Sequence, residues 1–137
     1  MILPKHEPRG HMKANGGALF SPIRIGGLDL PGRLFKTATA ETRATEDGFV
    51  TQDVIDFYAP MAKAGTPLII TGNIYISQQA KSAPRQLGVD DDNKIPGLSH
   101  LVDTVHTHGS KIFAQLNHCG RQIVPDFVGA DDVVSAS

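Results

Sequence analysis

The sequence has no tryptophan, a single cysteine and only 6% aromatic residues. Because Cys119 has no second cysteine to pair with, no internal disulfide can form. No secretory signal is visible at the start, so the sequence favours a reducing, cytoplasmic setting. No apolar run approaches the roughly 20 residues that span a bilayer. We therefore expect neither a membrane-spanning protein nor a small disulfide-stabilised one.

An excess of charge of one sign is missing as well. The chain has 13 Lys and Arg residues against 14 Asp and Glu residues, a formal net charge of −1. The basic residues form no stripe, which argues against nucleic acid or an anionic membrane as a partner. With 40% hydrophobic residues among 137, the chain has enough apolar material for a core. Its length lies within the range of roughly 50–250 residues that is usual for one domain.

The start of the chain differs from the rest. Residues 1–18 mix Pro, Gly, Lys and His without periodicity, which predicts a flexible leader. Residues 19–137 then form the predicted domain. Gly26 and Gly27 separate two short apolar segments at its beginning, a pattern typical of a small hairpin.

Strand and helix patterns alternate after the hairpin. Apolar runs predict strands over 34–39, 67–77 and 110–118, and apolar residues at helical spacing predict helices over 51–65 and 95–109. Thr51 is a suitable N-cap and Gly65 a suitable end for the first helix, whereas Pro60 predicts a bend or an early stop. The continuous run Leu68–Ile70 suits a strand of a parallel sheet. This order predicts an α/β layer or barrel.

In parallel α/β folds the ligand site lies at the carboxyl ends of the strands. At the third such end stands Gln115, whose amide can donate and accept hydrogen bonds at once. A buried amide needs a partner, and a ligand ring with alternating carbonyl and N–H groups would suit it. The alternative is that Gln115 only ties a neighbouring strand or loop. We expect Glu41 and Arg43, on the first loop, to form a solvated or paired surface; the alternative is that they face the substrate.

Three segments resemble, in the right order, the N-terminal part of the old yellow enzyme family of FMN-dependent NAD(P)H oxidoreductases and ene-reductases. They are LFSPIRIGGLDLPGRLFKTATAETRATEDG, KAGTPLIITGNIYIS and VHTHGSKIFAQLNHCGRQ. The last contains an H-x-G-R pattern, from His118 to Arg121. The resemblance implies a partial TIM (β/α)8 barrel, with an N-terminal hairpin and roughly the first three β/α units.

The resemblance also implies a cofactor and a chemistry. FMN would lie at the carboxyl ends of the strands, with Gln115 on its pyrimidine edge and the backbone of Thr39, Ala40 and Asn73 beside the ring. NAD(P)H would be the hydride donor, and hydride would pass through flavin N5 to an activated alkene or a similar small-molecule acceptor. His118 and Arg121 would have substrate-binding or structural roles, and no catalytic residue is assigned.

A (β/α)8 barrel takes about 250 residues, and the family's substrate-anchoring pair, proton-donor Tyr and phosphate loops come after the segments matched here. Two hypotheses remain. In the first, the chain is the N-terminal part of an FMN oxidoreductase, either truncated or completed by another chain, and its expected partner is a complementary C-terminal barrel chain or a second copy in a homo-oligomer. In the second, it is a truncated, non-catalytic remnant or interaction fragment that binds no flavin by itself. The His106-Thr107-His108 pair precedes a strand instead of following one, so no metal site is expected.

Overall fold

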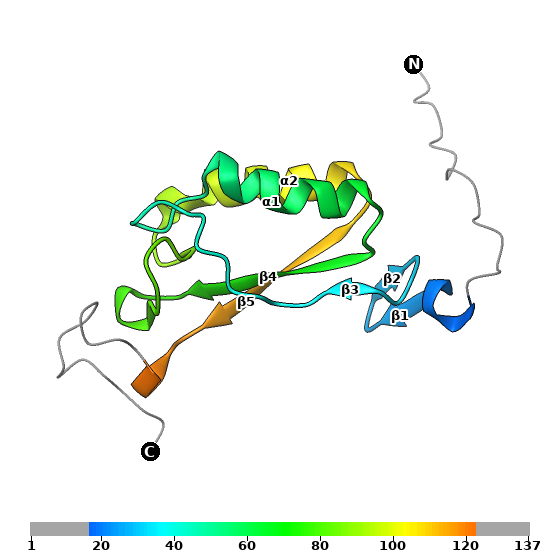
Figure 1. The fold of residues 1–137 in the computed structure, drawn as a ribbon, viewed down its shortest axis with the longest axis horizontal. Helices are drawn as coiled ribbons and strands as arrows, with labels where there is room; N and C mark the ends of the chain where they lie inside the picture. Colours follow the sequence, from blue (N-terminus) through cyan, green and yellow to red (C-terminus); the bar gives the residue numbers. More distant parts are fainter. Residues whose placement is uncertain (1–16, 123–137) are drawn as a thin grey trace. The chain divides into compact units, whose positions relative to one another are not determined.

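The structure is a computed structural model that describes residues 17–122. Along the chain it has, in order, the 3-10 helix η1 (Gly17–Phe20), β1 (Ile23–Ile25), β2 (Leu28–Leu30), β3 (Phe35–Lys36), α1 (Gln52–Lys63), β4 (Leu68–Tyr75), the 3-10 helices η2 (Gln78–Ala80) and η3 (Asp92–Lys94), α2 (Ile95–Thr107), β5 (Lys111–Asn117) and the 3-10 helix η4 (Gly120–Gln122) (Figure 1). No helix among these residues is long and apolar enough to cross a membrane. The leader predicted for residues 1–18 lies outside the described residues up to position 16.

The chain divides into two compact units, with the boundary after Arg33. The described part of the first unit contains the predicted hairpin, in which β1 pairs antiparallel with β2 and Ile25 is opposite Leu28. Gly26 takes a positive φ of 56° in the two-residue turn, a conformation that costs glycine little. The hairpin predicted from the Gly26-Gly27 pair is therefore confirmed.

The second unit is a three-stranded parallel sheet in the order β3-β4-β5, with two helices. Both helices lie on the same side of the sheet (Figure 1). The core lies between the two helices and the sheet. Its buried residues come from both helices, from β4 and from two loops: Ala44, Val54, Ile55, Tyr58, Ala62, Ile69, Ile74, Leu87, Leu101 and Val105. The predicted α/β order is confirmed, and the fold is a partial barrel with no closed barrel among the described residues.

The first long helix begins as predicted and ends later than Pro60 suggested. The side chain of Thr51 caps α1 by accepting a hydrogen bond from the N–H of Val54 over 3.4 Å. The helix runs through Pro60 to Lys63, so the predicted early stop is wrong. Pro60 is exposed, and its carbonyl still accepts from the N–H of Ala64 over 2.9 Å. The proline ring therefore faces solvent and does not disturb the core side of the helix.

The face of the sheet away from the helices carries polar and apolar side chains together. Ile112 on β5 packs against the core, and side chains of a strand alternate between its two faces. Phe113 and Gln115 follow Ile112 by one and by three positions, so their side chains lie on the opposite face, which no helix among residues 17–122 covers. Both residues are exposed. This face is the one that would line the interior of a barrel.

Candidate functional site at the carboxyl ends of the strands

The carboxyl ends of β4 and β5 are held in a specific register. Asn73 on β4 lies directly opposite Gln115 on β5, and a register shift separates this pair from the preceding pair, Ile70 and Phe113. At this bulge the hydroxyl of Thr71 accepts a hydrogen bond from the backbone N–H of Gln115 over 3.1 Å. The bulge thereby sets which residues of the two strands are neighbours at the sheet end.

The Gln115 side chain lies on the face of the sheet that no helix among residues 17–122 covers, called the bare face below, where it is accessible to a ligand. Its amide makes no hydrogen bond with any of residues 17–122, so the alternative of a tie to a neighbouring strand or loop finds no support there. The residue is exposed, not buried as the sequence predicted. Its position on the side away from the helices is, however, the position that the predicted cofactor contact needs.

Asn73 is already engaged by a loop of the protein. Its carbonyl accepts from Nε2 of Gln86 over 3.1 Å, and its own amide donates to Oγ of Ser82 over 3.4 Å. Gln86 is almost fully buried, and its Oε1 accepts from the backbone N–H and the hydroxyl of Ser82. This closed set of bonds fastens the loop after β4 to the end of that strand. The Asn73 carbonyl is consequently a structural acceptor, and only the remaining groups of Asn73 are available to a ligand.

Thr39 and Ala40 are exposed on the loop that follows β3. They line an open hollow of about 490 Å³ with other residues of this loop, of α1 and of the loop after β4: Glu41, Thr42, Arg43, Asp53, Phe57 and Arg85. The carbonyl of Thr39 also lies close to the Cα of Gly72 on β4. The structure thus brings Asn73 and Gln115 together at the sheet end, and it connects Thr39 to them through Gly72, without placing all four in one hollow.

A buried polar cluster next to Gly72 was not predicted from the sequence. Tyr58 on α1 donates its hydroxyl proton to Oε1 of Glu41 and accepts from the N–H of Gly72 over 2.9 Å. Glu41 is only 9% exposed, so the solvated alternative of the predicted solvated or paired surface is wrong for this residue. Lys36 on β3 donates to the carbonyl of Ile70 over 3.3 Å and lies over the Tyr58 ring. Glu41 and Tyr58 lie 17 positions apart in the sequence, so no local pattern indicates that the two side chains meet.

The charge states of this cluster are shifted by burial. Burial raises the pKa of the Glu41 carboxyl, although the Tyr58 hydroxyl and the Lys36 ammonium oppose the shift. Burial lowers the pKa of Lys36, and the nearby Glu41 opposes that shift. Burial and the bond to Glu41 raise the pKa of Tyr58. All three shifts favour uncharged side chains.

The two loops at this end of the sheet are tied together by Arg85, which takes a positive φ of 54°. Its Nε donates to the carbonyl of Ala44 over 3.0 Å, and its guanidinium lies 3.6 Å from the carboxylate of Asp53. The N–H of Ala44 in turn donates to the Arg85 carbonyl over 3.0 Å. A positive φ is uncommon outside glycine, and here it lets one residue bond the loop after β3 through both its backbone and its side chain.

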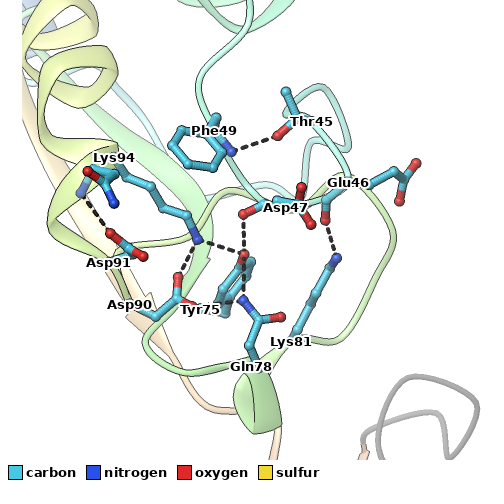
Figure 2. A network of polar contacts seen from close by, with 11 residues as sticks. Thr45, Glu46, Asp47, Phe49, Tyr75, Gln78, Lys81, Asp90, Asp91 and Lys94 are labelled. Carbon is cyan, nitrogen blue, oxygen red and sulfur yellow. Dashed lines mark hydrogen bonds and ion pairs between the residues drawn. The ribbon is translucent and has the colours of Figure 1, made fainter.

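A second network, also missed from the sequence, surrounds Tyr75 at the last position of β4 (Figure 2). The Tyr75 hydroxyl donates to the carbonyl of Asp47 over 2.7 Å and accepts from Nζ of Lys94 over 2.9 Å. Lys94, only 3% exposed, also pairs with Asp90. Nε2 of Gln78 donates to the second oxygen of Asp90 over 2.8 Å. The network joins both loops to the start of α2 and so stabilises the edge on which the site residues lie.

The two residues predicted for substrate or structural roles lie beyond the end of β5. His118 is exposed, and its Nδ1 accepts from the N–H of Gly120 over 3.0 Å. Arg121 is exposed in the short helix η4. The amide of Asn117 donates to the sulfur of Cys119 over 3.1 Å. Within residues 17–122, no group of three His, Cys, Asp or Glu side chains is arranged to hold a metal ion.

Comparison with known proteins agrees with this fold. Residues 18–137 match the family described as the NADH:flavin oxidoreductase / NADH oxidase family. The chain is 42% identical over 108 residues to the NADH oxidase of Thermoanaerobacter brockii, covering 78% of this chain and 17% of that protein. It is 35% identical over 111 residues to the NADH:acrylate oxidoreductase of Vibrio harveyi, covering 81% of this chain and 11% of that protein.

A solved structure gives the same answer for the fold. The old yellow enzyme homologue of Zymomonas mobilis superposes with a TM-score of 0.75 and 32% identity, over 82% of this chain and 31% of that one. The chain therefore spans less than a third of the length of each of these three proteins. Since the family match covers most of its residues, the chain belongs to the NADH:flavin oxidoreductase / NADH oxidase family, the family of the old yellow enzymes.

Proposed function

We propose that residues 19–137 form the N-terminal part of an FMN-binding barrel and contribute one edge of the flavin site. The observation that carries this proposal is the Gln115 amide, which is exposed on the bare face of the sheet and unbonded within residues 17–122. An amide fixed at a strand end is suited to the polar rim of a flavin, where donors stabilise the negative charge of the reduced ring.

The neighbouring residues fit the same ligand. Asn73 stands opposite Gln115, and Gly72, the residue before Asn73, lets the backbone of Thr39 pack closely against β4. The side chain of Ala40 has no donor or acceptor, so the backbone N–H is the group that we propose meets the ligand there. His118 and Arg121 are proposed to contact the substrate or a neighbouring segment, since both are exposed just past the end of β5.

When bound, FMN supplies hydride transfer between NAD(P)H and an acceptor. For the acceptor we propose a small molecule with an activated alkene. The name of the Vibrio harveyi relative supports this class, because acrylate is an alkene conjugated to a carboxylate. The chain's own residues would bind and orient the ring, and the groups that act on the substrate would come from the rest of the barrel. A cytoplasmic location and a complementing chain or homo-oligomer remain predictions.

Complementation tests the proposal. The full chain is mixed with a Zymomonas mobilis old yellow enzyme homologue from which the matching segment has been removed, and flavin absorbance is measured after gel filtration. The full chain alone is expected to retain no flavin and to show no NADPH oxidation with an enone. The mixture is expected to retain flavin and to oxidise NADPH in the presence of the enone. The removed Zymomonas segment, supplied as a separate chain, is the positive control.

A pair of variants makes the test specific to the site. Gln115→Ala is expected to weaken FMN binding by the mixture about tenfold, the effect of one lost hydrogen bond worth about 1.4 kcal/mol. Gln79→Ala, at an exposed position of η2, removes the same group elsewhere and is the matched control. If the positive control binds flavin and the wild-type mixture does not, the chain is a non-catalytic fragment. Tight, stoichiometric FMN binding by the chain alone would also overturn the proposal of a partial site.

A further inference from the structure

The buried cluster around Glu41 connects three elements at the edge of the proposed site. Lys36 comes from β3, Glu41 from the loop after β3, and Tyr58 from the core side of α1. Glu41 and Tyr58 meet at Gly72 of β4, one residue before Asn73, and Lys36 donates to the carbonyl of Ile70 on the same strand. The proposed flavin contacts do not include Glu41, Lys36 or Tyr58, so the cluster needs an explanation of its own.

The Glu41 carboxyl is wedged against the backbone of β4. A Cβ placed on Gly72 would lie 2.0 Å from Oε2 of Glu41 and 2.7 Å from the carbonyl oxygen of Thr39. Only glycine leaves room for both groups at this point. The Glu41 carboxyl and the Thr39 carbonyl consequently both pack against β4 at Gly72. The position of the loop that carries Thr39 and Ala40 therefore depends on how the Glu41 carboxyl packs there.

Oε1 and Oε2 of this carboxyl have different surroundings. Oε1 accepts from the Tyr58 hydroxyl. Oε2 is buried and has no hydrogen-bond partner among the described residues. A buried carboxylate needs donors on both oxygens to offset the loss of water. The Tyr58 hydroxyl and the backbone N–H groups of Gly72 and Glu41 favour the ionised form, but burial outweighs them, and Oε2 has no hydrogen-bond partner among the described residues. An un-ionised acid would leave no unbalanced charge in the same space.

The charged groups around the carboxyl do not change this conclusion. Lys36 is the cation that faces it from β3. From α1 it meets the Tyr58 hydroxyl, and Asp53 lies further along the hollow. The loops add Arg43 and Arg85, both at the hollow, where Arg85 is already paired with Asp53. On the β4 side the group in contact is the backbone of Gly72.

We propose that Glu41 is a positioning residue that works as an un-ionised carboxylic acid, holding the backbone of Thr39 and Ala40 against Gly72 at the edge of the ligand site. This inference rests on the proposed function only in taking FMN as the ligand. Ionisation of Glu41 places a negative charge on a carboxyl whose Oε2 has no donor among the described residues, and the loop then moves away from β4. The site is thereby coupled to the protonation of a group that does not touch the ligand.

The first test needs no flavin. The stability of the full chain and of its Glu41→Gln variant to urea is compared across pH, with Glu46→Gln, at an exposed position of the same loop, as the matched control. A folded-state pKa raised above the ordinary value of 4.5 gives stability that is complete below that value and is lost as the pH rises through the folded pKa. The wild type should therefore match Glu41→Gln in acid and become progressively less stable than the variant as the pH rises.

The opposite slope would show that Glu41 acts as an anion paired with Lys36, and a difference independent of pH would show that its protonation does not matter. Either result overturns the proposal. The chain has only two tyrosines, so NMR of labelled tyrosine adds a direct readout. The Tyr58 ring signals should titrate together with the loss of stability in the wild type and should stay constant in Glu41→Gln, while Tyr75 serves as the internal reference.

The second test uses the complemented barrel. Glu41→Ala is expected to weaken FMN binding roughly tenfold, and Glu41→Gln to restore most of the affinity, while Glu46→Ala has no effect. Equal loss with Ala and Gln would contradict a neutral positioning group. If the wild-type mixture binds no flavin, the proposed function fails, and the pH dependence of the full chain still decides the role of Glu41.

Discussion

The backbone N–H of Gln115 on β5 donates a hydrogen bond to the hydroxyl of Thr71 on β4 over 3.1 Å. The same hydroxyl donates to the carbonyl of Gly72 over 2.8 Å. One buried side chain therefore connects the bulge of β4 to the residue whose amide is proposed to meet the flavin. The position of Gln115 depends on this hydroxyl because the ordinary ladder of the two strands is interrupted there.

Replacing Thr71 by valine keeps the shape of the side chain and removes both hydrogen bonds. We expect the free energy of unfolding to fall by about 1–3 kcal/mol, since the N–H of Gln115 loses its partner. Thr107→Val is the matched control, because that hydroxyl also donates to a backbone carbonyl but is exposed at the end of α2. Urea denaturation of both variants measures the difference, and equal losses would mean that the Thr71 bond adds nothing.

Most of the fold follows from local patterns in the sequence. The apolar run Leu68–Ile70, the Thr51 cap and the Gly26-Gly27 turn each determine an element through neighbouring residues, and these elements are confirmed. The first strand is much shorter than predicted, Phe35–Lys36 against 34–39. The apolar pattern shows which segment is extended, but pairing with β4 decides how far the ladder runs.

The candidate site could be predicted only in part. The place of Gln115 at a strand end on the inner face follows from strand order and alternation. The burial of Glu41 does not, because it depends on Tyr58 and Gly72, which lie 17 and 31 positions further along the chain. A polar loop residue looks solvated until its tertiary partners are known. The same reason explains why the network around Tyr75 was missed.

The crowding of Tyr75 by Gly88 gives a prediction about packing. A Cβ at Gly88 would lie 2.4 Å from the Tyr75 ring, so Gly88→Ala should destabilise the protein by about 1–3 kcal/mol and displace the ring. Gly65→Ala is the control for backbone effects, because Gly65 has a φ of 86° with nothing within 4 Å. That variant should cost about 1–2 kcal/mol. The tyrosine band of the near-ultraviolet circular dichroism spectrum, which arises from only two residues and is not overlapped by tryptophan, should change in Gly88→Ala alone.

The ion pair between Asp90 and Lys94 predicts a loss of stability in acid. Burial by itself would raise the pKa of Asp90, but the bonds from Lys94 and Gln78 lower it below its ordinary value of 3.8. A lowered folded-state pKa gives stability that is present above the unfolded value and is lost as the pH falls through the folded one. The pKa of Lys94 is shifted upward, because the bonds to Asp90 and Tyr75 outweigh the effect of burial. The stability that Lys94 contributes is therefore lost only as the pH rises above the ordinary lysine pKa of 10.5.

Asp90→Asn should therefore cost about 3–5 kcal/mol near neutral pH, because it leaves the Lys94 ammonium buried without its counter-charge. The control is Asp103→Asn, which removes an exposed carboxylate from α2. Urea denaturation from about pH 3 to about pH 7 measures the difference in free energy of unfolding between the wild type and Asp90→Asn, and this gap should become smaller in acid. A gap of constant size would mean that the hydrogen bonds of Asp90, and not its charge, stabilise the network.

Pro60 predicts a gain in stability. It lies inside α1, where it cannot donate to the carbonyl of Asp56 four residues before it. Pro60→Ala should raise the free energy of unfolding by about 2 kcal/mol. Alanine is about 3 kcal/mol more favourable than proline in a helix interior, and the greater conformational entropy of the unfolded variant lowers this gain by up to about 1 kcal/mol. Pro96→Ala is the matched control, since Pro96 stands in the first turn of α2. A proline is favourable there, so that variant should gain nothing. Thermal unfolding of the two variants separates these outcomes, and a loss in Pro60→Ala would show that α1 is adapted to its proline.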